Sequence, residues 1–140
     1  MSNDRISVHV REQEGKARIS TREAVLLSGR AADGTELADT FKAGELILGA
    51  LGTCILGTVR AYAKNHGITG LREVQVEVLG EEAVSPARIA RVKVALALAG
   101  NLSEEDELRL HRAAGACKIH NTLSRGLEIQ ISETRQATLA

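Results

Sequence analysis

Apolar and polar residues alternate in short stretches near the start of the chain, which is the pattern of half-buried β-strands. The first stretch, RISVHV, covers residues 5–10. A turn around Gly15 separates it from residues 17–22 and 23–29, which we expect to form a second and a third strand. Residues 28–44 are polar and contain several glycines, so they are predicted to form a loop.

The strongest helical segment covers residues 45–66, which contain no proline and no charge for more than three turns. Its residues are apolar nearly all round, as expected for a helix buried at the centre of a fold or of a dimer. Gly67 follows as the expected C-terminal cap. Glycines in or beside the segment favour a close approach of another helix, or a bend; they are Gly44, Gly49, Gly52 and Gly57.

The clearest strand pattern lies further on, in residues 71–82 and 88–100. Both stretches alternate regularly, and a short link with the only proline of the chain joins them. They therefore predict an antiparallel hairpin with one polar face. A change of phase between Ile89 and Val92 indicates a β-bulge.

The C-terminal third begins with Ser103, a good N-cap with acidic residues directly after it, Glu104, Glu105 and Asp106 among them. The helix it starts has an apolar side made of Leu108, Leu110, Ala113 and Ala114. Residues 118–126 are expected to form a further turn or short helix, ended by Gly126, and residues 127–132 a final strand. Together the elements predict one α+β domain over residues 1–140, with mostly antiparallel strands around one very apolar helix.

The charge and the low aromatic content of the chain argue against some classes of partner. Eighteen basic and eighteen acidic residues cancel, and Phe41 and Tyr62 are the only aromatic residues, so nucleic acid is not expected as a partner. The uncharged stretch of residues 46–59 is shorter than the roughly 20 residues that span a bilayer, and no signal peptide is evident. We therefore expect a cytoplasmic protein without a membrane partner, in which cysteines are more often free or reactive than permanently bridged.

The two cysteines, Cys54 and Cys117, are the candidate reactive groups. Cys117 and His120 share a helix face, but the chain lacks the four-ligand pattern of a structural zinc site. The glycines of the apolar helix lack the Lys-Ser/Thr of a phosphate-binding loop, so neither a metal nor a cofactor is expected. Two alternatives stay open: both cysteines are small core residues, or they form a redox pair.

Two motifs carry a resemblance to a known family. GELILGALGTC (residues 44–54) and ACKIHNTLSRGLEIQI (residues 116–131) resemble the two cysteine signatures of the OsmC/Ohr family, the osmotically inducible and organic hydroperoxide resistance proteins. The order of predicted elements agrees over about residues 5–133. The resemblance implies the OsmC-like fold and an intertwined homodimer.

The resemblance also implies a thiol peroxidase. Cys54 would attack an organic hydroperoxide as a thiolate, and Cys117 would capture the resulting sulfenic acid in a disulfide. A dithiol, lipoyl-linked in several members, would be the reductant. The same fold without turnover, as a redox sensor or a small-ligand binder, is the alternative function.

In the family an arginine held by a glutamate activates the cysteine. Glu45 matches the glutamate, but about 13.5 Å of helix separate it from Cys54, so we expect it to reach the partner's site in the dimer. The ordinary alternative for Glu45 is a first-turn acid that stabilises its own helix. Arg22 is the first candidate for the arginine and Arg30 the second.

The chain departs from the family at two places. Lys118 occupies the position of a proline, where it could lower the pKa of Cys117 or change the exposure of the turn. Residues 33–44, DGTELADTFKAG, replace the usual glycine- and proline-rich loop, which leaves the entry of the substrate open.

Overall fold

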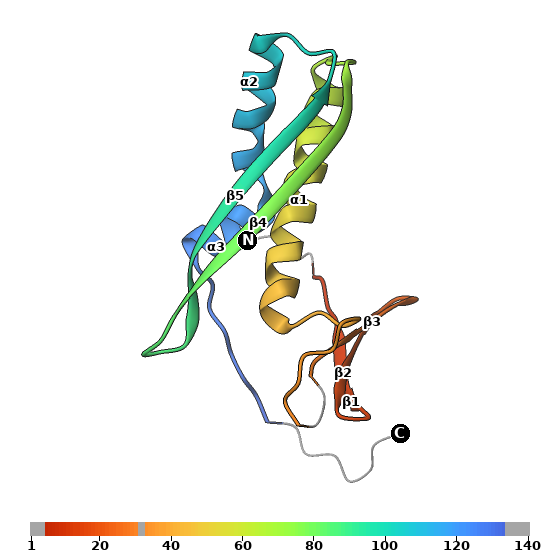
Figure 1. Cartoon of the computed structure of the whole chain (residues 1–140), viewed down its shortest axis with the longest axis vertical. Helices are drawn as coiled ribbons and strands as arrows, with labels where there is room; N and C mark the ends of the chain where they lie inside the picture. Colours follow the sequence, from red (N-terminus) through yellow and green to blue (C-terminus); the bar gives the residue numbers. More distant parts are fainter. Residues whose placement is uncertain (1–4, 31–32, 134–140) are drawn as a thin grey trace.

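The computed structural model describes residues 5–30 and 33–133, which form the predicted α+β fold (Figure 1). The elements in chain order are β1 (His9–Gln13), β2 (Lys16–Thr21), β3 (Ala24–Ser28), α1 (Ala43–Asn65), β4 (Leu71–Ala83), β5 (Arg88–Gly100), α2 (Glu104–Ala113), the 3₁₀ turn η1 (Ala114–Ala116) and α3 (Lys118–Arg125). Strands β1, β2 and β3 form one antiparallel sheet, and β4 and β5 form another.

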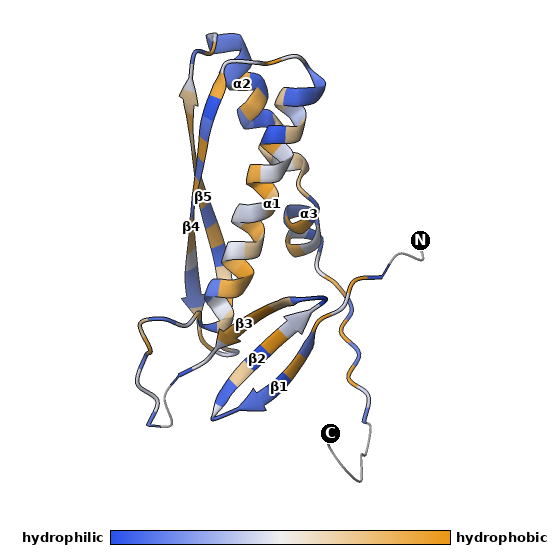
Figure 2. Cartoon of the chain, turned by 90° about the vertical axis from the view of Figure 1, so that its right-hand side faces the viewer, coloured by the Kyte–Doolittle hydropathy of each residue, from blue (hydrophilic) through white to orange (hydrophobic). Residues whose placement is uncertain are grey.

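The N-terminal sheet lies beyond the first turn of α1, apart from the β4–β5 hairpin (Figures 1 and 2). Its three strands were expected, but the first begins at His9 rather than at residue 5. The turn between β1 and β2 determines how the two strands are aligned. Glu14 and Gly15 both have positive φ angles, as in the tight turns that match strand twist. This turn pairs Gln13 with Lys16 and so fixes where β1 lies along β2.

The β4–β5 hairpin confirms the prediction for residues 71–82 and 88–100, including the bulge. Glu81 pairs with Arg91, and the next residue, Glu82, pairs with Ile89. Ala90 is therefore left without a partner in the ladder. The bulge keeps alternate apolar residues of both strands on the side that faces α1, where Val74 is buried.

Helix α1 packs along the hairpin and also contacts α2, η1 and α3 (Figure 2). Its buried residues are one i, i+4 stripe: Leu51, Ile55, Val59 and Ala63. The fold of the single chain thus buries one side of the helix and leaves side chains such as Ile47 and Leu56 exposed, so burial at the centre of a dimer stays a prediction. The helix has the length and apolar composition of a membrane span, with a mean hydropathy of 1.5, but core helices of soluble proteins share both properties.

Helix α2 begins as predicted, with the Ser103 hydroxyl accepting the N–H of Asp106 at 3.0 Å. Leu110 and Ala113 are buried, whereas Leu108, expected on the same side, is exposed. On a helix Leu108 lies about 200° round from Leu110, which places it on the opposite side. Gly126 ends α3 with a φ of 76°, as expected.

The final strand expected in residues 127–132 is absent from the described residues, in which this segment pairs with no other. Its alternating apolar side chains, Leu127, Ile129 and Ile131, are all exposed, Ile131 by 92%. The alternation indicates that one face of the segment has to be buried, and among the described residues no strand lies beside it to cover that face.

Candidate active site

The two cysteines, 63 positions apart in the sequence, meet where α1 packs against the start of α3. Cys54 lies near the middle of α1, and Cys117 is the residue that caps α3. Both thiols are free, and each is among the groups that shift the pKa of the other. Cys117 is completely covered and belongs to the apolar core, against which Cys54 and Ile119 pack.

Local structure explains how Cys117 reaches this position. The 3₁₀ turn η1 ends α2, and Cys117 follows in an extended conformation with φ −75° and ψ 138°. Its sulfur accepts the N–H of His120 at 3.3 Å, which is the part that a serine or aspartate side chain plays at other helix N-termini. The cap places the Cys117 side chain against α1, inside the core.

The surroundings of Cys54 favour its thiolate. Burial raises the pKa of the thiol. Hydrogen bonding lowers it by more than burial raises it, so the net pKa is below its ordinary value; the donors are Cys117, the main-chain N–H groups of Ile119 and Lys118, and Thr58. Donors at a helix N-terminus are a known means of activating a cysteine. No cationic side chain contributes to this shift within residues 5–30 and 33–133.

The surroundings of Cys117 favour its neutral thiol. Burial raises its pKa first, and the hydrogen bond to Cys54 raises it further, while the N–H groups of His120 and Ile119 oppose the change. Cys117 thus favours its protonated form. Of the two alternatives for Lys118, a lowered pKa of Cys117 is wrong, because the pKa of Cys117 is raised and Lys118 is not among the groups that shift it.

Thr58, one turn after Cys54, was missed by the sequence-based interpretation. Its hydroxyl donates to the Cys54 carbonyl at 2.8 Å. The same hydroxyl is among the groups that lower the pKa of Cys54. One hydroxyl proton serves one acceptor at a time, so the hydroxyl has to rotate away from the carbonyl to donate to the thiolate. The i, i+4 spacing from Cys54 was the available signal for this contact.

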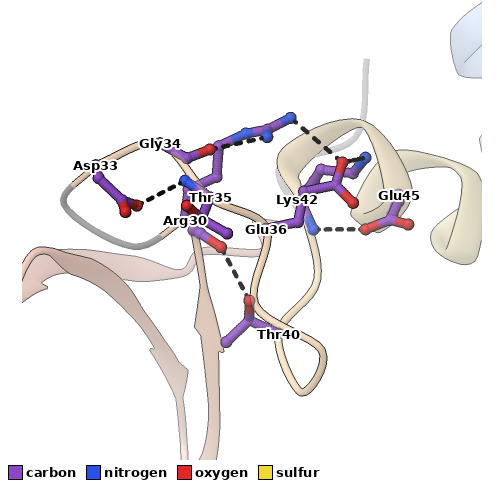
Figure 3. Close-up of polar contacts among 9 residues, drawn as sticks. Arg30, Asp33, Gly34, Thr35, Glu36, Thr40, Lys42 and Glu45 are labelled. Carbon is purple, nitrogen blue, oxygen red and sulfur yellow. Dashed lines mark hydrogen bonds and ion pairs between the residues drawn. The ribbon is translucent and has the colours of Figure 1, made fainter.

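Glu45 lies at the first turn of α1, where it accepts the main-chain N–H of Lys42 at 2.8 Å (Figure 3). This is the reciprocal half of a capping box. The Lys42 ammonium pairs in turn with Glu36 at 2.7 Å. The structure therefore gives Glu45 the helix-stabilising position and does not bring it to Cys54.

The two candidate arginines lie on the N-terminal side of α1. Arg22 occupies the exposed turn between β2 and β3 with a φ of 51°. Arg30 donates to the Gly34 carbonyl at 3.3 Å and lies 3.7 Å from a Glu36 carboxylate oxygen (Figure 3). Neither guanidinium is among the groups that shift the pKa of Cys54.

A groove of about 670 Å³ runs along α1 and β5 and is lined also by residues of η1 and α3, but by neither cysteine. Leu51 and Ile55 of α1, the neighbours of Cys54 on the helix, form its floor, and β5 forms one wall. Polar side chains at its edge come from Arg91, His111 and His120. In the described ranges, no group of three or more histidine, cysteine, aspartate or glutamate residues is arranged to hold a metal ion.

No curated protein matches the chain, but solved structures do. An OsmC-like protein from Mycoplasma pneumoniae superposes with a TM-score of 0.74 at 16% identity, covering 88% of this chain and 89% of the other. The organic hydroperoxide resistance protein OhrB of Bacillus subtilis gives a TM-score of 0.59 at 20% identity, covering 86% and 90%. The organic hydroperoxide resistance protein OsmC from Legionella pneumophila gives 0.59 at 17% identity, covering 88% and 91%.

These likenesses establish the fold. The family described as OsmC-like protein matches residues 34–132, which include both cysteine motifs and most of the chain. The chain is therefore a member of the OsmC-like family.

Proposed function

We propose that this protein is a thiol peroxidase that reduces organic hydroperoxides. The observation that carries the proposal is the unequal pair of thiols: Cys54 has a lowered pKa, and Cys117, in the buried core against which Cys54 packs, has a raised one. One sulfur is thus prepared to attack, and the other is held protonated beside it. Two solved structures with this fold carry the name organic hydroperoxide resistance protein, which supports a peroxide as substrate.

The reaction follows from this arrangement. The Cys54 thiolate attacks the terminal oxygen of a hydroperoxide, the O–O bond breaks, and the alcohol leaves after taking up a proton. Cys54 is now a sulfenic acid. The Cys117 sulfur attacks it, a disulfide forms, and water leaves with the proton that Cys117 held. A dithiol reductant then exchanges with the disulfide, restores both thiols and is itself oxidised to a cyclic disulfide.

The groove along α1 and β5 suits the apolar part of such a substrate. Most of its lining side chains are aliphatic, and its volume of about 670 Å³ lies within the range of small-molecule sites. Leu51 and Ile55 of its lining flank Cys54 in the sequence of α1, so a hydrocarbon tail in the groove would lie against the helix that carries the attacking thiol. Hydrogen peroxide has no tail and gains nothing from this contact.

We also propose a homodimer. In it, Glu45 and Arg22 would be the glutamate and the arginine that activate a cysteine thiol. The apolar α1 has one exposed side, and residues 127–132 lack a partner strand in the described chain. A second copy would cover both. Because Glu45 does not reach Cys54 of its own chain, any action on a thiol requires the partner's site.

The decisive experiment is turnover of cumene hydroperoxide with a dithiol, compared in the wild type, Cys54→Ser and Cys117→Ser. We expect no turnover with Cys54→Ser, and oxidation without a disulfide with Cys117→Ser. Mass spectrometry after one equivalent of hydroperoxide should find two hydrogens lost, mapped to a Cys54–Cys117 bond. Formation of that disulfide without turnover would favour the redox-sensor alternative, and no reaction of Cys54 would remove both functions.

A further inference from the structure

Helices α2 and α3, with η1 between them, lie along α1 and carry Cys117 into the core (Figure 2). Leu110 and Cys117 of this segment are completely buried. Apart from the surroundings of the two thiols, one side-chain hydrogen bond joins the segment to α1 in the part of the chain that the structure describes. The Nε of Arg109 donates to the Tyr62 hydroxyl at 3.3 Å, and we call this contact the tether.

Both partners of the tether are held in place by further contacts. His66 stacks on the Tyr62 ring with the ring centroids 3.8 Å apart, and its Nδ1 donates to the Tyr62 carbonyl at 3.0 Å. The Arg109 guanidinium lies 5.6 Å from the centroid of the same ring and also donates to Asp106 at 3.2 Å. A bond between groups that are already oriented costs less side-chain entropy than one between two mobile surface groups.

The tether lies at a matched distance from the two thiols along both helices. Tyr62 follows Cys54 by eight positions on the same side of α1, and Arg109 precedes Cys117 by eight positions. The thiols and the tether are therefore separated by about 12 Å of α1. Because Cys117 is completely covered, a reagent in solution reaches its sulfur only when the segment opens locally from α1.

We propose that the tether holds α2, η1 and α3 closed against α1 and thereby sets how often Cys117 becomes accessible. Tyr62 and Arg109 are thus positioning residues, which act through the segment that carries Cys117. The purpose of the tether rests on the proposed function, in which Cys117 has to meet Cys54 before any other reagent. The opening itself is a property of the reduced protein and needs no peroxide.

Tyr62→Phe tests the tether, because it removes the hydroxyl and keeps the ring that packs against the core and His66. The measurement is the initial rate at which iodoacetamide modifies Cys117, followed by mass spectrometry of its peptide. For a covered group this rate is the rate of the open form multiplied by the fraction open. We expect it to rise about fivefold, the effect of losing one hydrogen bond. Cys54 is already partly exposed and should change less.

Ser28→Ala is the matched control for a general loss of stability. It removes another hydroxyl hydrogen bond, from Ser28 to the Phe41 carbonyl at 2.7 Å, in the N-terminal sheet. We expect it to leave the modification of Cys117 unchanged. An equal rise in both variants would assign the effect to global unfolding and overturn the inference, as would a rate in Tyr62→Phe equal to that of the wild type.

A double-mutant cycle tests whether the two residues act as a pair. Arg109→Met removes the guanidinium and should raise the rate at Cys117 at least as much as Tyr62→Phe does. In the Arg109→Met background, Tyr62→Phe should add little, because its partner is already gone. Fully additive effects would show that the hydroxyl and the guanidinium act independently, which contradicts the tether.

Hydrogen–deuterium exchange follows the same opening without a thiol reagent. The amides of α2 should exchange faster in Tyr62→Phe than in the wild type, whereas those of β5 should not change. Exchange in α2 as slow as in the wild type would overturn the inference. Neither measurement involves a peroxide, so failure of peroxidase turnover and failure of the tether are separate results.

Discussion

At the scale of single residues, the site depends on neutral donors. A thiol, a hydroxyl and two main-chain N–H groups together outweigh the burial that disfavours the Cys54 thiolate. Each of these hydrogen bonds is individually modest, and together they are sufficient because the site is partly dry. Removal of any one donor should therefore weaken activation without abolishing it.

The pH dependence of peroxide reduction should show this activation. Since the pKa of Cys54 is lowered, its thiolate fraction and the rate of its oxidation rise with pH and level off below the pH that an ordinary cysteine requires. Cys117→Ala removes the thiol donor and should move the profile to higher pH. Cys117→Ser keeps a hydroxyl donor and should move it less. Rapid-mixing measurements of Cys54 oxidation across pH test this, and identical profiles would contradict the role of the Cys117 proton.

Thr58 offers a second test at this scale. Thr58→Val keeps the shape of the side chain but removes the hydroxyl, so the pKa of Cys54 should rise and its alkylation at neutral pH should slow by a few-fold. Thr58→Ser keeps the hydroxyl and should stay close to the wild type. If the serine variant is as slow as the valine variant, the methyl group and not the hydroxyl is responsible.

At the scale of elements, the hairpin closes against the loop before it through two glycines. Gly100 ends β5 with a φ of 146°, and a Cβ there would collide with the carbonyl of Gly70. A Cβ on Gly70 would collide with the carbonyl of Asn101, whose own N–H donates to Gly70 at 3.0 Å. The two backbones thus pass too closely for any side chain.

Gly100→Ala should accordingly destabilise the protein. The left-handed conformation alone costs about 1–3 kcal/mol for a residue with a Cβ, and the overlap with Gly70 adds to it. Gly115→Ala is the control, because a Cβ there meets nothing within 4 Å and the backbone is not left-handed. Urea unfolding of both variants measures the difference in free energy, and equal stabilities would contradict the close approach.

Local patterns predicted those elements whose partners are close in sequence. The alternation in residues 71–82 and 88–100 predicted both strands and the bulge, because each strand supplies the other's partner. The same alternation in residues 127–132 predicted a strand that the structure does not contain in the described residues. Alternation indicates that one face of a segment has to be buried, but it does not identify the partner that would bury it. In the site, the cysteines are recognisable by residue type, whereas a main-chain donor such as the His120 N–H, which the Cys117 sulfur accepts, has no signature of its own.

At the scale of the whole molecule, apolar surface remains uncovered on two sides. The exposed side of α1 includes Leu56, and a Cβ on nearby Gly49 would meet nothing within 4 Å. An apolar helix side with glycine in it is suited to the close approach of a second helix. Monomeric proteins seldom leave large apolar patches exposed, which supports the proposed homodimer.

Light scattering after size-exclusion chromatography tests that arrangement. The wild type should have twice the mass of one chain, and Leu56→Glu should lower the mass to that of a monomer because it places a charge on the exposed side of α1. Leu79→Glu is the matched control, an exposed leucine on the hairpin. A monomeric wild type, or a dimer that persists in Leu56→Glu, would contradict an interface on this side.

The cap of α3 links the redox state of the protein to the order of a helix. The atom that closes the first turn is the Cys117 sulfur, which accepts the N–H of His120 and would also form the disulfide. When that sulfur turns toward Cys54, the His120 amide loses its acceptor. Hydrogen–deuterium exchange at this amide should then be faster in the oxidised protein, with the amide within α2 at Leu110 as the unaffected reference. Each catalytic cycle would thus loosen and retighten the start of α3, which gives a dithiol reductant a moment of access to a sulfur that is otherwise completely covered.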